Sequence, residues 1–248
     1  MFQIGLMLAP LCVHFIRWVL SRAKYPVRVI LRDGEMFMVA ARELADAGIP
    51  EFAPCAEWTA HYATRGISAG LDWHKIFRPN WMARGFLNGE GWGDNTFTFV
   101  DTGFSGTICD AMARAGFKLQ PLFFISSNSS IPGFFIAAAA AADANKPVFN
   151  LASDIGVNIF DSTPKTVLSP KYEDIVKRGG KYSLDIKPNM NPVAVQDHTD
   201  FMDGIRCYVQ TMTRTDETPL DIAFKKLLAS HEAIATALKP YNGRCQSL

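Results

Sequence analysis

The sequence has no large excess of charge and lacks the cysteine and histidine spacings that mark a metal site. Its 25 lysines and arginines are balanced by 24 aspartates and glutamates, so the formal net charge is +1. A nearly neutral chain has no strong general attraction to nucleic acid or to an anionic membrane. No Cys-x-x-Cys pair occurs, and we predict no protein-built metal site. The scattered cysteines, Cys12, Cys55, Cys109, Cys207 and Cys245, indicate reduced thiols in a cytoplasmic protein.

A long hydrophobic run occurs at the N-terminus, but polar residues interrupt it. Phe2 to Leu20 is strongly apolar, yet Pro10, His14 and Arg17 lie inside it and no clear cleavage site follows. A membrane-spanning helix needs about 20 nearly uninterrupted apolar residues. We therefore predict no membrane anchor and no targeting signal. Instead we expect a helix with Pro10 in its first turn, ending near Lys24, whose apolar face is covered by a sheet.

The overall composition is that of a globular protein with a sizeable core. Hydrophobic residues make up 48% of the 248 residues and charged residues 20%. This length fits one large domain, or one domain with a small appendage. We expect an α/β phosphosugar-binding core in residues 1–150 and a C-terminal extension, residues 151–248, packed on it. The run Phe134 to Ala142 contains six consecutive alanines, and its structure stays open between helix and strand.

The most informative stretch runs from Asn95 to Gly116. A β-prone apolar segment, Thr96 to Val100, leads into a glycine-rich turn, Asp101 to Thr107. Residues 108–115 then carry apolar side chains at the spacing of one helical face. A strand, a glycine-rich turn and a helix together place backbone N–H groups and a helix N-terminus in front of an anion.

Individual residues of this turn suit a phosphosugar. Gly103 and Gly106 allow positive φ and close approach of the backbone to a ligand. Ser105 and Thr107 supply hydroxyl donors and can cap the helix. Asp101, at the carboxyl end of the strand, can accept hydrogen bonds from sugar hydroxyls. The alternative interpretation is an ordinary turn between strand and helix, with glycines used for geometry alone.

A second strand, loop and helix occur earlier in the chain. Val27 to Leu31 is a β-branched run typical of a central parallel strand, and Met36 to Ala47 is patterned as a helix. Between them lies the loop Arg32-Asp33-Gly34-Glu35. In a doubly wound sheet, the carboxyl ends of neighbouring parallel strands share a ligand-binding crevice. Arg32 and Asp101 would then face one ligand, although Arg32 and Asp33 could equally form a structural ion pair or cap.

The remaining elements are predicted from local patterns. We expect a short strand ending at Arg65, a buried strand at Leu122 to Ile125, a turn at Gly179-Gly180 between short strands, and helices at Phe201 to Met212 and Leu220 to Leu238. Leu71 to Trp92 holds three tryptophans and several basic residues, including Arg78 and Arg84. This region could form a lid over a ligand or a helical excursion whose tryptophans fill the core.

The main stretch resembles the loop that binds phosphoribosyl pyrophosphate (PRPP) in type I phosphoribosyltransferases. In that family a hydrophobic strand ends in two acidic residues, followed by Thr/Ser-Gly and a Thr. Asp101 matches the first acid, Thr102 replaces the second, and Ser105-Gly106-Thr107 is one residue tighter than the common ending. Arg32-Asp33-Gly34 looks like the earlier loop that holds pyrophosphate in the family.

This resemblance implies a mostly parallel doubly wound α/β fold and an enzyme that displaces pyrophosphate at the anomeric carbon of PRPP or a related phosphosugar. It implies Asp101 and Arg32 as catalytic residues. It implies Asp33, Gly34, Arg65, Thr102, Gly103, Ser105, Gly106 and Thr107 as substrate-binding residues. Mg²⁺ would bridge the oxygens of the substrate pyrophosphate. No general base is identifiable in the sequence.

The whole chain also resembles a region of large proteins classed as HAD-superfamily hydrolases in bacterial glycan-synthesis clusters. The matching segments are Ile4-Gly5 to Pro10, Ile30 to Gly34, Thr64-Arg65, Val100 to Thr107 and Asp203-Gly204-Ile205. That region follows the phosphatase domain, and the phosphatase motif Asp-x-Asp-x-Thr is missing here. This resemblance implies a non-catalytic sugar-phosphate-binding module of a glycan or nucleotide-modification pathway. A third alternative is a structural protein without a ligand.

Overall fold

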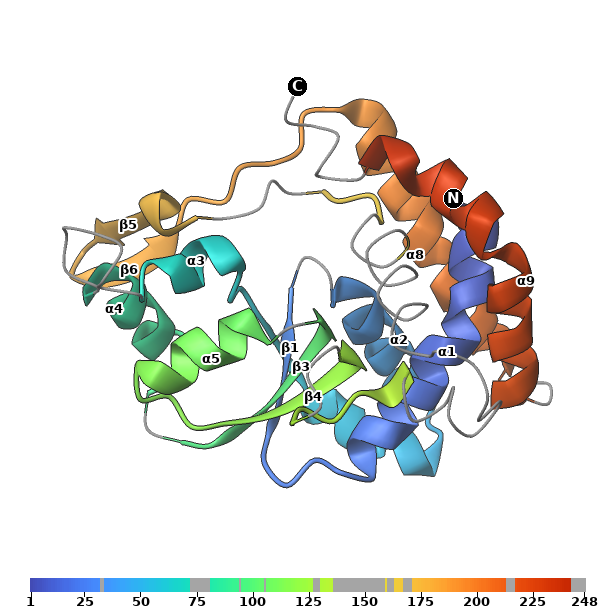
Figure 1. The fold of residues 1–248 in the computed structure, drawn as a ribbon, viewed down its shortest axis with the longest axis horizontal. Helices are drawn as coiled ribbons and strands as arrows, with labels where there is room; N and C mark the ends of the chain where they lie inside the picture. The colour runs from blue at the N-terminus through green and yellow to red at the C-terminus, as the bar shows by residue number, and fades with distance from the viewer. Residues whose placement is uncertain are drawn as a thin grey trace.

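A four-stranded parallel sheet forms the centre of the protein (Figure 1). The computed structural model describes residues 1–31, 34–71, 81–93, 95–104, 106–126, 130–135, 159, 163–166, 171–212 and 217–241. The strands are β1 (Val27–Ile30), β2 (Thr59–His61), β3 (Phe97–Phe104) and β4 (Leu119–Ser126). They follow the order β2-β1-β3-β4, and every neighbouring pair is parallel. The predicted α/β class with a parallel sheet is therefore confirmed.

The strand order reverses between β1 and β3. The chain leaves β1 for the outer strand β2, returns across the sheet to β3 and continues outward to β4. Val29 of β1 pairs with Val100 of β3, so the two strands run side by side toward the same end of the sheet. In open α/β sheets, ligands bind outside the carboxyl ends of the strands at such a reversal.

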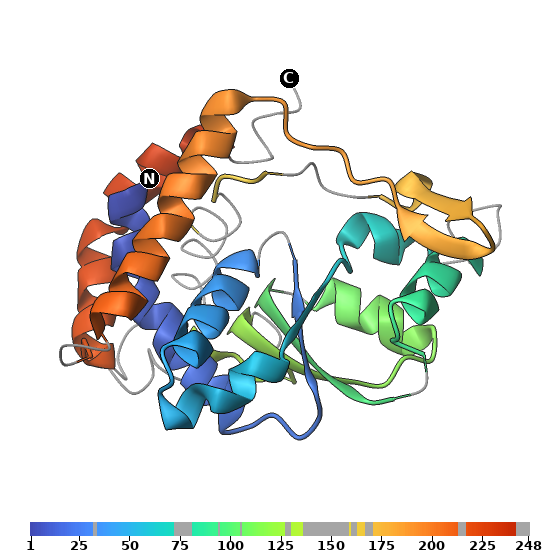
Figure 2. The same cartoon turned by 180° about the vertical axis from the view of Figure 1, so that it is seen from behind.

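Helices cover both faces of the sheet (Figures 1 and 2). One face carries α1 (Phe2–Leu20), α2 (Glu35–Asp46), α8 (Pro192–Met212) and α9 (Leu220–Leu238), with the 3-10 segments η1 (Pro50–Glu57) and η4 (Lys239–Tyr241). The other face carries α3 (Arg65–Ala69), α4 (Trp81–Gly89) and α5 (Thr107–Arg114). Strand residues divide between the two sides, since Phe99 and Val100 belong to different hydrophobic clusters. A sheet with helices on both faces agrees with the predicted doubly wound arrangement.

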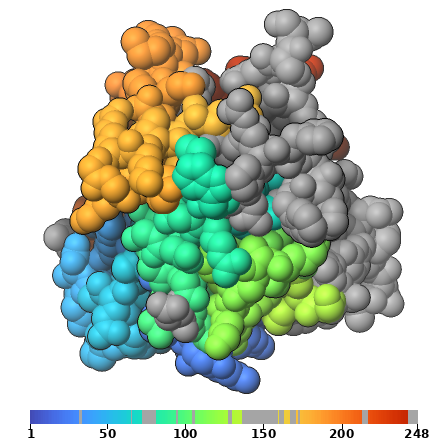
Figure 3. Space-filling model, turned by 90° about the vertical axis from the view of Figure 1, so that its left-hand side faces the viewer, coloured from blue at the N-terminus to red at the C-terminus, as the bar shows by residue number. Residues whose placement is uncertain are grey.

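A small hairpin lies outside the main sheet. Strands β5 (Ile175–Arg178) and β6 (Lys181–Leu184) pair antiparallel, after the 3-10 turn η3 (Tyr172–Asp174). The predicted turn is confirmed, because Gly179 and Gly180 both have positive φ. The hairpin packs against α4, where Tyr182 meets the ring of Trp81 at 5.8 Å between centroids. Figure 3 shows the yellow hairpin lying against the green surface of α4.

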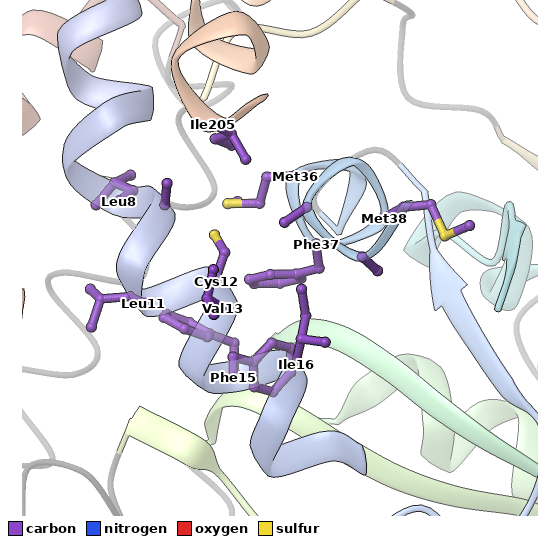
Figure 4. Close-up of a cluster of buried hydrophobic side chains, with 14 of the residues drawn as sticks. Leu8, Leu11, Cys12, Val13, Phe15, Ile16, Met36, Phe37, Met38 and Ile205 are labelled. Carbon is purple, nitrogen blue, oxygen red and sulfur yellow. The ribbon is translucent and has the colours of Figure 1, made fainter. Parts of the chain in front are cut away.

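The N-terminal helix α1 is a core element of the protein. By length and composition it could cross a membrane, but just over half of its residues are buried against the rest of the described chain. Figure 4 shows the buried side chains of α1 beside Phe37 of α2, and the ring centroids of Phe15 and Phe37 are 4.6 Å apart. The helix packs chiefly on α8, α9 and α2. The prediction that the sheet covers its apolar face is confirmed in part, because Phe15 contacts Phe124 of β4 and lies in one buried cluster with residues of β1, β3 and β4.

Several predicted boundaries were wrong. Pro10 lies in the middle of α1 and is not in its first turn. No strand ends at Arg65, because β2 stops at His61 and Arg65 begins α3. Trp92 is fully buried, so the core interpretation holds for that residue. Residues 72–80, with Arg78, and residues 136–158, with the alanine run and the proposed boundary at residue 150, lie outside the described part of the chain.

Candidate functional site

The carboxyl edge of the sheet is the end at which the strands finish and helices α2, α3 and α5 begin. Gly34 follows β1 and caps α2, Thr64 follows β2 and caps α3, and Gly106 follows β3 and caps α5. Figure 2 shows the ends of β1 and β3 directed toward the region between α8 and α3. The predicted site residues Arg32, Asp33 and Ser105 lie outside the described residues, so their side chains are not located.

Strand β3 continues past the point where the sequence predicted its end. The parallel ladder with β4 extends through Asp101, opposite Phe123, to Phe104, opposite Ser126. Asp101 and Thr102 therefore lie within the strand, with exposed fractions of 7% and 2%. The expectation that Asp101 stands at the carboxyl end of β3 was wrong, because pairing with β4 holds the polar segment extended.

The carboxylate of Asp101 accepts hydrogen bonds from the next residue in the strand, Thr102. Its Oδ1 accepts the backbone N–H of Thr102 at 2.8 Å and the Thr102 hydroxyl at 3.3 Å. On the α5 side, the charge of Asp101 adds to burial in raising the pKa of the Cys109 thiol well above its ordinary value. The hydrogen bonds from Thr102 thus hold the Asp101 carboxylate within β3, before the loop that leads to α5.

Gly103 and Gly106 have the predicted positive φ, but neighbouring protein atoms leave little space for a side chain at either position. Gly103 has φ +103° and Gly106 has φ +77°. A Cβ on Gly103 would lie 2.6 Å from the Cβ of Phe123, and one on Gly106 would lie 2.5 Å from Cδ1 of Ile131. Gly34 has an ordinary φ of −88°, and a Cβ there would overlap the carbonyl oxygen of Ile30. Close packing against the backbone therefore requires glycine at positions 34 and 103, and the positive φ favours it at position 106, whether or not a ligand binds.

Helix α5 begins at a glycine. Its N-cap is Gly106 in the left-handed conformation, which has no side chain to make a capping hydrogen bond, and Ser105, one of the two hydroxyl residues predicted to cap the helix, lies outside the described residues. The first helical bond runs from Asp110 N–H to the carbonyl of Gly106 at 2.9 Å. A helix leaves its first N–H groups without intrahelical partners, and these groups attract anions. The N-terminus of α5 therefore stays a candidate for the predicted phosphate cradle.

A histidine and a glutamate that the sequence analysis did not single out meet at the same edge. Glu35 is the first residue of α2, and its Oε2 lies 3.1 Å from Nε2 of His198 on α8. His198 is 7% exposed. Tyr62, just after β2, has its pKa raised by burial and by the charge of Glu35. Since 163 residues separate Glu35 from His198, no spacing in the sequence could have predicted this pair.

Arg65 and Arg84, two further basic residues considered for the site, lie at different ends of the sheet. Arg65 begins α3 at the carboxyl edge, as part of a turn in which the Thr64 hydroxyl accepts the N–H of Ile67 at 3.3 Å. Arg84 lies elsewhere, because its guanidinium sits 5.9 Å from the ring of Phe117, which precedes the amino end of β4. Arg84 lines a polar cavity of about 340 Å³ there. Arg84 therefore does not join the carboxyl-edge site.

Comparison with known proteins adds no family. No protein-family model matches the chain, and no curated protein matches it significantly. In the described part of the chain, no three His, Cys, Asp or Glu side chains gather into a metal-binding group. The two family resemblances therefore rest on the sequence motifs alone.

Proposed function

We propose that the protein binds PRPP or a related phosphosugar at the carboxyl edge and displaces pyrophosphate from the anomeric carbon. The observation that carries this proposal is the adjacency of β1 and β3 at the reversal of strand order. Arg32, Asp33 and Gly34 follow β1 in the chain, and Ser105, Gly106 and Thr107 follow β3. Such a reversal is where open α/β sheets bind ligands.

Each end of the ligand has a proposed partner. The N-terminus of α5, with Thr107 and the backbone after Gly103, would hold the 5′-phosphate. The loop with Arg32, Asp33 and Gly34 would hold pyrophosphate, and Asp101 would orient the ribose side of the loop. Mg²⁺ fits this arrangement as an ion bound mainly by the substrate, since it typically takes one or two carboxylates with phosphate oxygens and water. It would supply charge neutralisation on the leaving pyrophosphate.

Ligand-dependent stability tests the proposal. A ligand that binds the folded state alone raises stability by mass action, by about 2.7 kcal/mol at a concentration of 100 times Kd. Thermal unfolding should therefore shift upward with PRPP plus Mg²⁺, and more than with ribose 5-phosphate or a nucleotide sugar. Isothermal titration calorimetry would then give the affinity. Equal unfolding curves with and without all three ligands would rule out the phosphosugar site.

A second candidate function is binding of a sugar phosphate without catalysis. It is favoured by the burial of Asp101 and by Thr102, which stands where the family has a second acid and donates to Asp101. A carboxylate that is already hydrogen-bonded within its own strand is less available to a reacting sugar. The two candidates differ in one measurement, because a binding module would stabilise with PRPP yet release no pyrophosphate.

A further inference from the structure

His198 differs from the other histidines that the structure describes. In His14 and His61, both ring nitrogens have polar partners within 3.4 Å. His231 contacts the backbone carbonyl of Leu228 and no carboxylate within the described chain. His198 alone in this set combines strong burial, a carboxylate on one nitrogen and a second nitrogen without a protein partner.

The two nitrogens of His198 face different surroundings. Nε2 lies 3.1 Å from Oε2 of Glu35. Nδ1 has no hydrogen-bond partner in the described chain. A carboxylate on one nitrogen fixes the ring orientation and the tautomer, and leaves the other nitrogen as the proton acceptor. This is the geometry of an oriented base.

The charged groups around His198 leave Glu35 as its direct partner. On α8 itself, Asp197 accepts a hydrogen bond from the Tyr241 hydroxyl, and Asp200 accepts from Gln196. On the β2 side, burial and the charge of Glu35 together raise the pKa of Tyr62. Helices α1 and α9 make no ion pair or hydrogen bond with His198 in the part of the chain that is described.

The position of the pair relates it to the carboxyl edge. Glu35 begins the helix that follows β1, directly after Gly34 of the loop proposed for pyrophosphate. Helix α8 packs along α2 and brings His198 to that helix start. The base is thus supplied by the C-terminal half of the chain to a site whose loops come from the N-terminal half.

We infer that His198 is the general base of the proposed transfer, with Glu35 as the residue that positions it; this inference rests on the proposed function. The acceptor is a neutral hydroxyl or nitrogen nucleophile that must lose a proton as it reacts. Its oxygen or nitrogen forms a bond to the anomeric carbon while the bond from that carbon to pyrophosphate breaks. Pyrophosphate leaves with the electron pair, and the acceptor proton moves to Nδ1 of His198.

The tautomer of His198 is the first test and needs no substrate. Protein with ¹⁵N-labelled histidine gives separate signals for Nδ1 and Nε2, and the His198→Gln variant identifies those of His198. We expect the neutral ring to carry its proton on Nε2, donated to Glu35, with Nδ1 unprotonated. A neutral ring protonated on Nδ1 would overturn the inference, because that nitrogen could not accept a proton.

Turnover with a defined probe is the second test. PRPP with Mg²⁺ is the substrate, water takes the place of the acceptor, and released pyrophosphate is measured against pH. His198→Gln should lower kcat by about 10²- to 10⁴-fold, the usual contribution of a general base, and abolish the acidic limb of the kcat profile. The KM for PRPP should change little. Glu35→Gln should reduce kcat less, since glutamine can still accept the Nε2 proton.

His14→Gln is the matched control, because His14 also has Nε2 beside a glutamate, Glu217 at 3.2 Å, but lies outside the carboxyl edge. It should leave kcat and its pH profile unchanged. If His198→Gln turns over PRPP as wild type does, with the acidic limb retained, the base role is wrong while the phosphosugar site stands. If wild type neither binds nor cleaves PRPP, the proposed function fails and the base role fails with it.

Discussion

Gly5 and Gly204 face each other where helices α1 and α8 cross in direct backbone contact. A Cβ on Gly5 would overlap the carbonyl oxygen of Phe201, and one on Gly204 would overlap the carbonyl oxygen of Phe2. The two glycines belong to segments at opposite ends of the chain. Their contact fixes α8 against the N-terminal half, and α8 carries His198 to the start of α2.

Gly204→Ala should therefore destabilise the protein. The added Cβ would also lie 2.7 Å from the backbone nitrogen of Leu6, so one of the two helices must shift. Overpacking of this kind costs about 1–3 kcal/mol. For a chain of this size each kcal/mol lowers Tm by roughly 2–4 °C. The control is Gly89→Ala, where the nearest atom to a Cβ is 3.9 Å away and alanine should be tolerated. Equal unfolding midpoints for the two variants would contradict the close crossing.

The ion pair between Arg17 and Glu51 should stabilise the protein at neutral pH and lose its effect at acidic pH. Nη2 of Arg17 lies 2.7 Å from Oε1 of Glu51 and also contacts Glu217. The hydrogen bond from Arg17 lowers the pKa of Glu51. A lowered pKa in the folded state means that the pair stabilises above the ordinary glutamate pKa and loses its effect as pH falls through the folded value.

The expected size of this effect is small, because both side chains are well exposed and such pairs contribute about 0.2–1 kcal/mol. Glu51→Gln should lower the free energy of unfolding at pH 7 and give no difference from wild type at pH 2, as measured by urea denaturation at each pH. Glu57→Gln is a suitable control, since Glu57 is exposed and lies in the same 3-10 segment. A deficit that persists at pH 2 would show that packing, and not charge, accounts for the change.

Local sequence patterns were sufficient for elements with clear ends. The β-branched run predicted β1, the pattern of residues 36–47 predicted α2, and the pattern of residues 220–238 predicted α9. Local patterns gave the wrong structure where pairing with a neighbouring strand determines the backbone conformation. Asp101 and Thr102 have the composition of a turn, yet the ladder to β4 keeps them in a strand.

Part of the candidate site could be predicted from the sequence, and part of it depends on long-range packing. The loops after β1 and β3 could be assigned to one edge, because parallel neighbours in a doubly wound sheet end together. His198 could not be assigned, because its approach to Glu35 depends on the crossing of α1 and α8 and the packing of α8 on α2. Long-range helix packing leaves no local signature in either segment.

Gly106→Ala should lower stability through two separable causes. The residue has a positive φ, which an alanine adopts at a cost of about 1–2 kcal/mol. The new Cβ would also meet Cδ1 of Ile131 at 2.5 Å. In a double-mutant cycle with Ile131→Ala, removal of that Cδ1 should relieve the contact but not the strain. The two losses in unfolding free energy should then be less than additive, by at least about 0.5 kcal/mol. Additive losses would mean that Ile131 does not pack on Gly106.

Thr102→Asp, which would recreate the acid pair of the phosphoribosyltransferase loop, should destabilise the fold and not produce a better enzyme. Thr102 is 2% exposed and donates to Asp101, so a carboxylate there would be a buried charge beside a second one. An uncompensated buried charge typically costs about 3–5 kcal/mol. Thr102→Val, which keeps the shape and removes only the hydroxyl, should cost about 1 kcal/mol. Urea denaturation of the three proteins measures the difference, and pyrophosphate release from PRPP measures the chemistry. A Thr102→Asp protein as stable as wild type, with faster pyrophosphate release, would mean that position 102 is open to the ligand and that the buried strand does not extend to it.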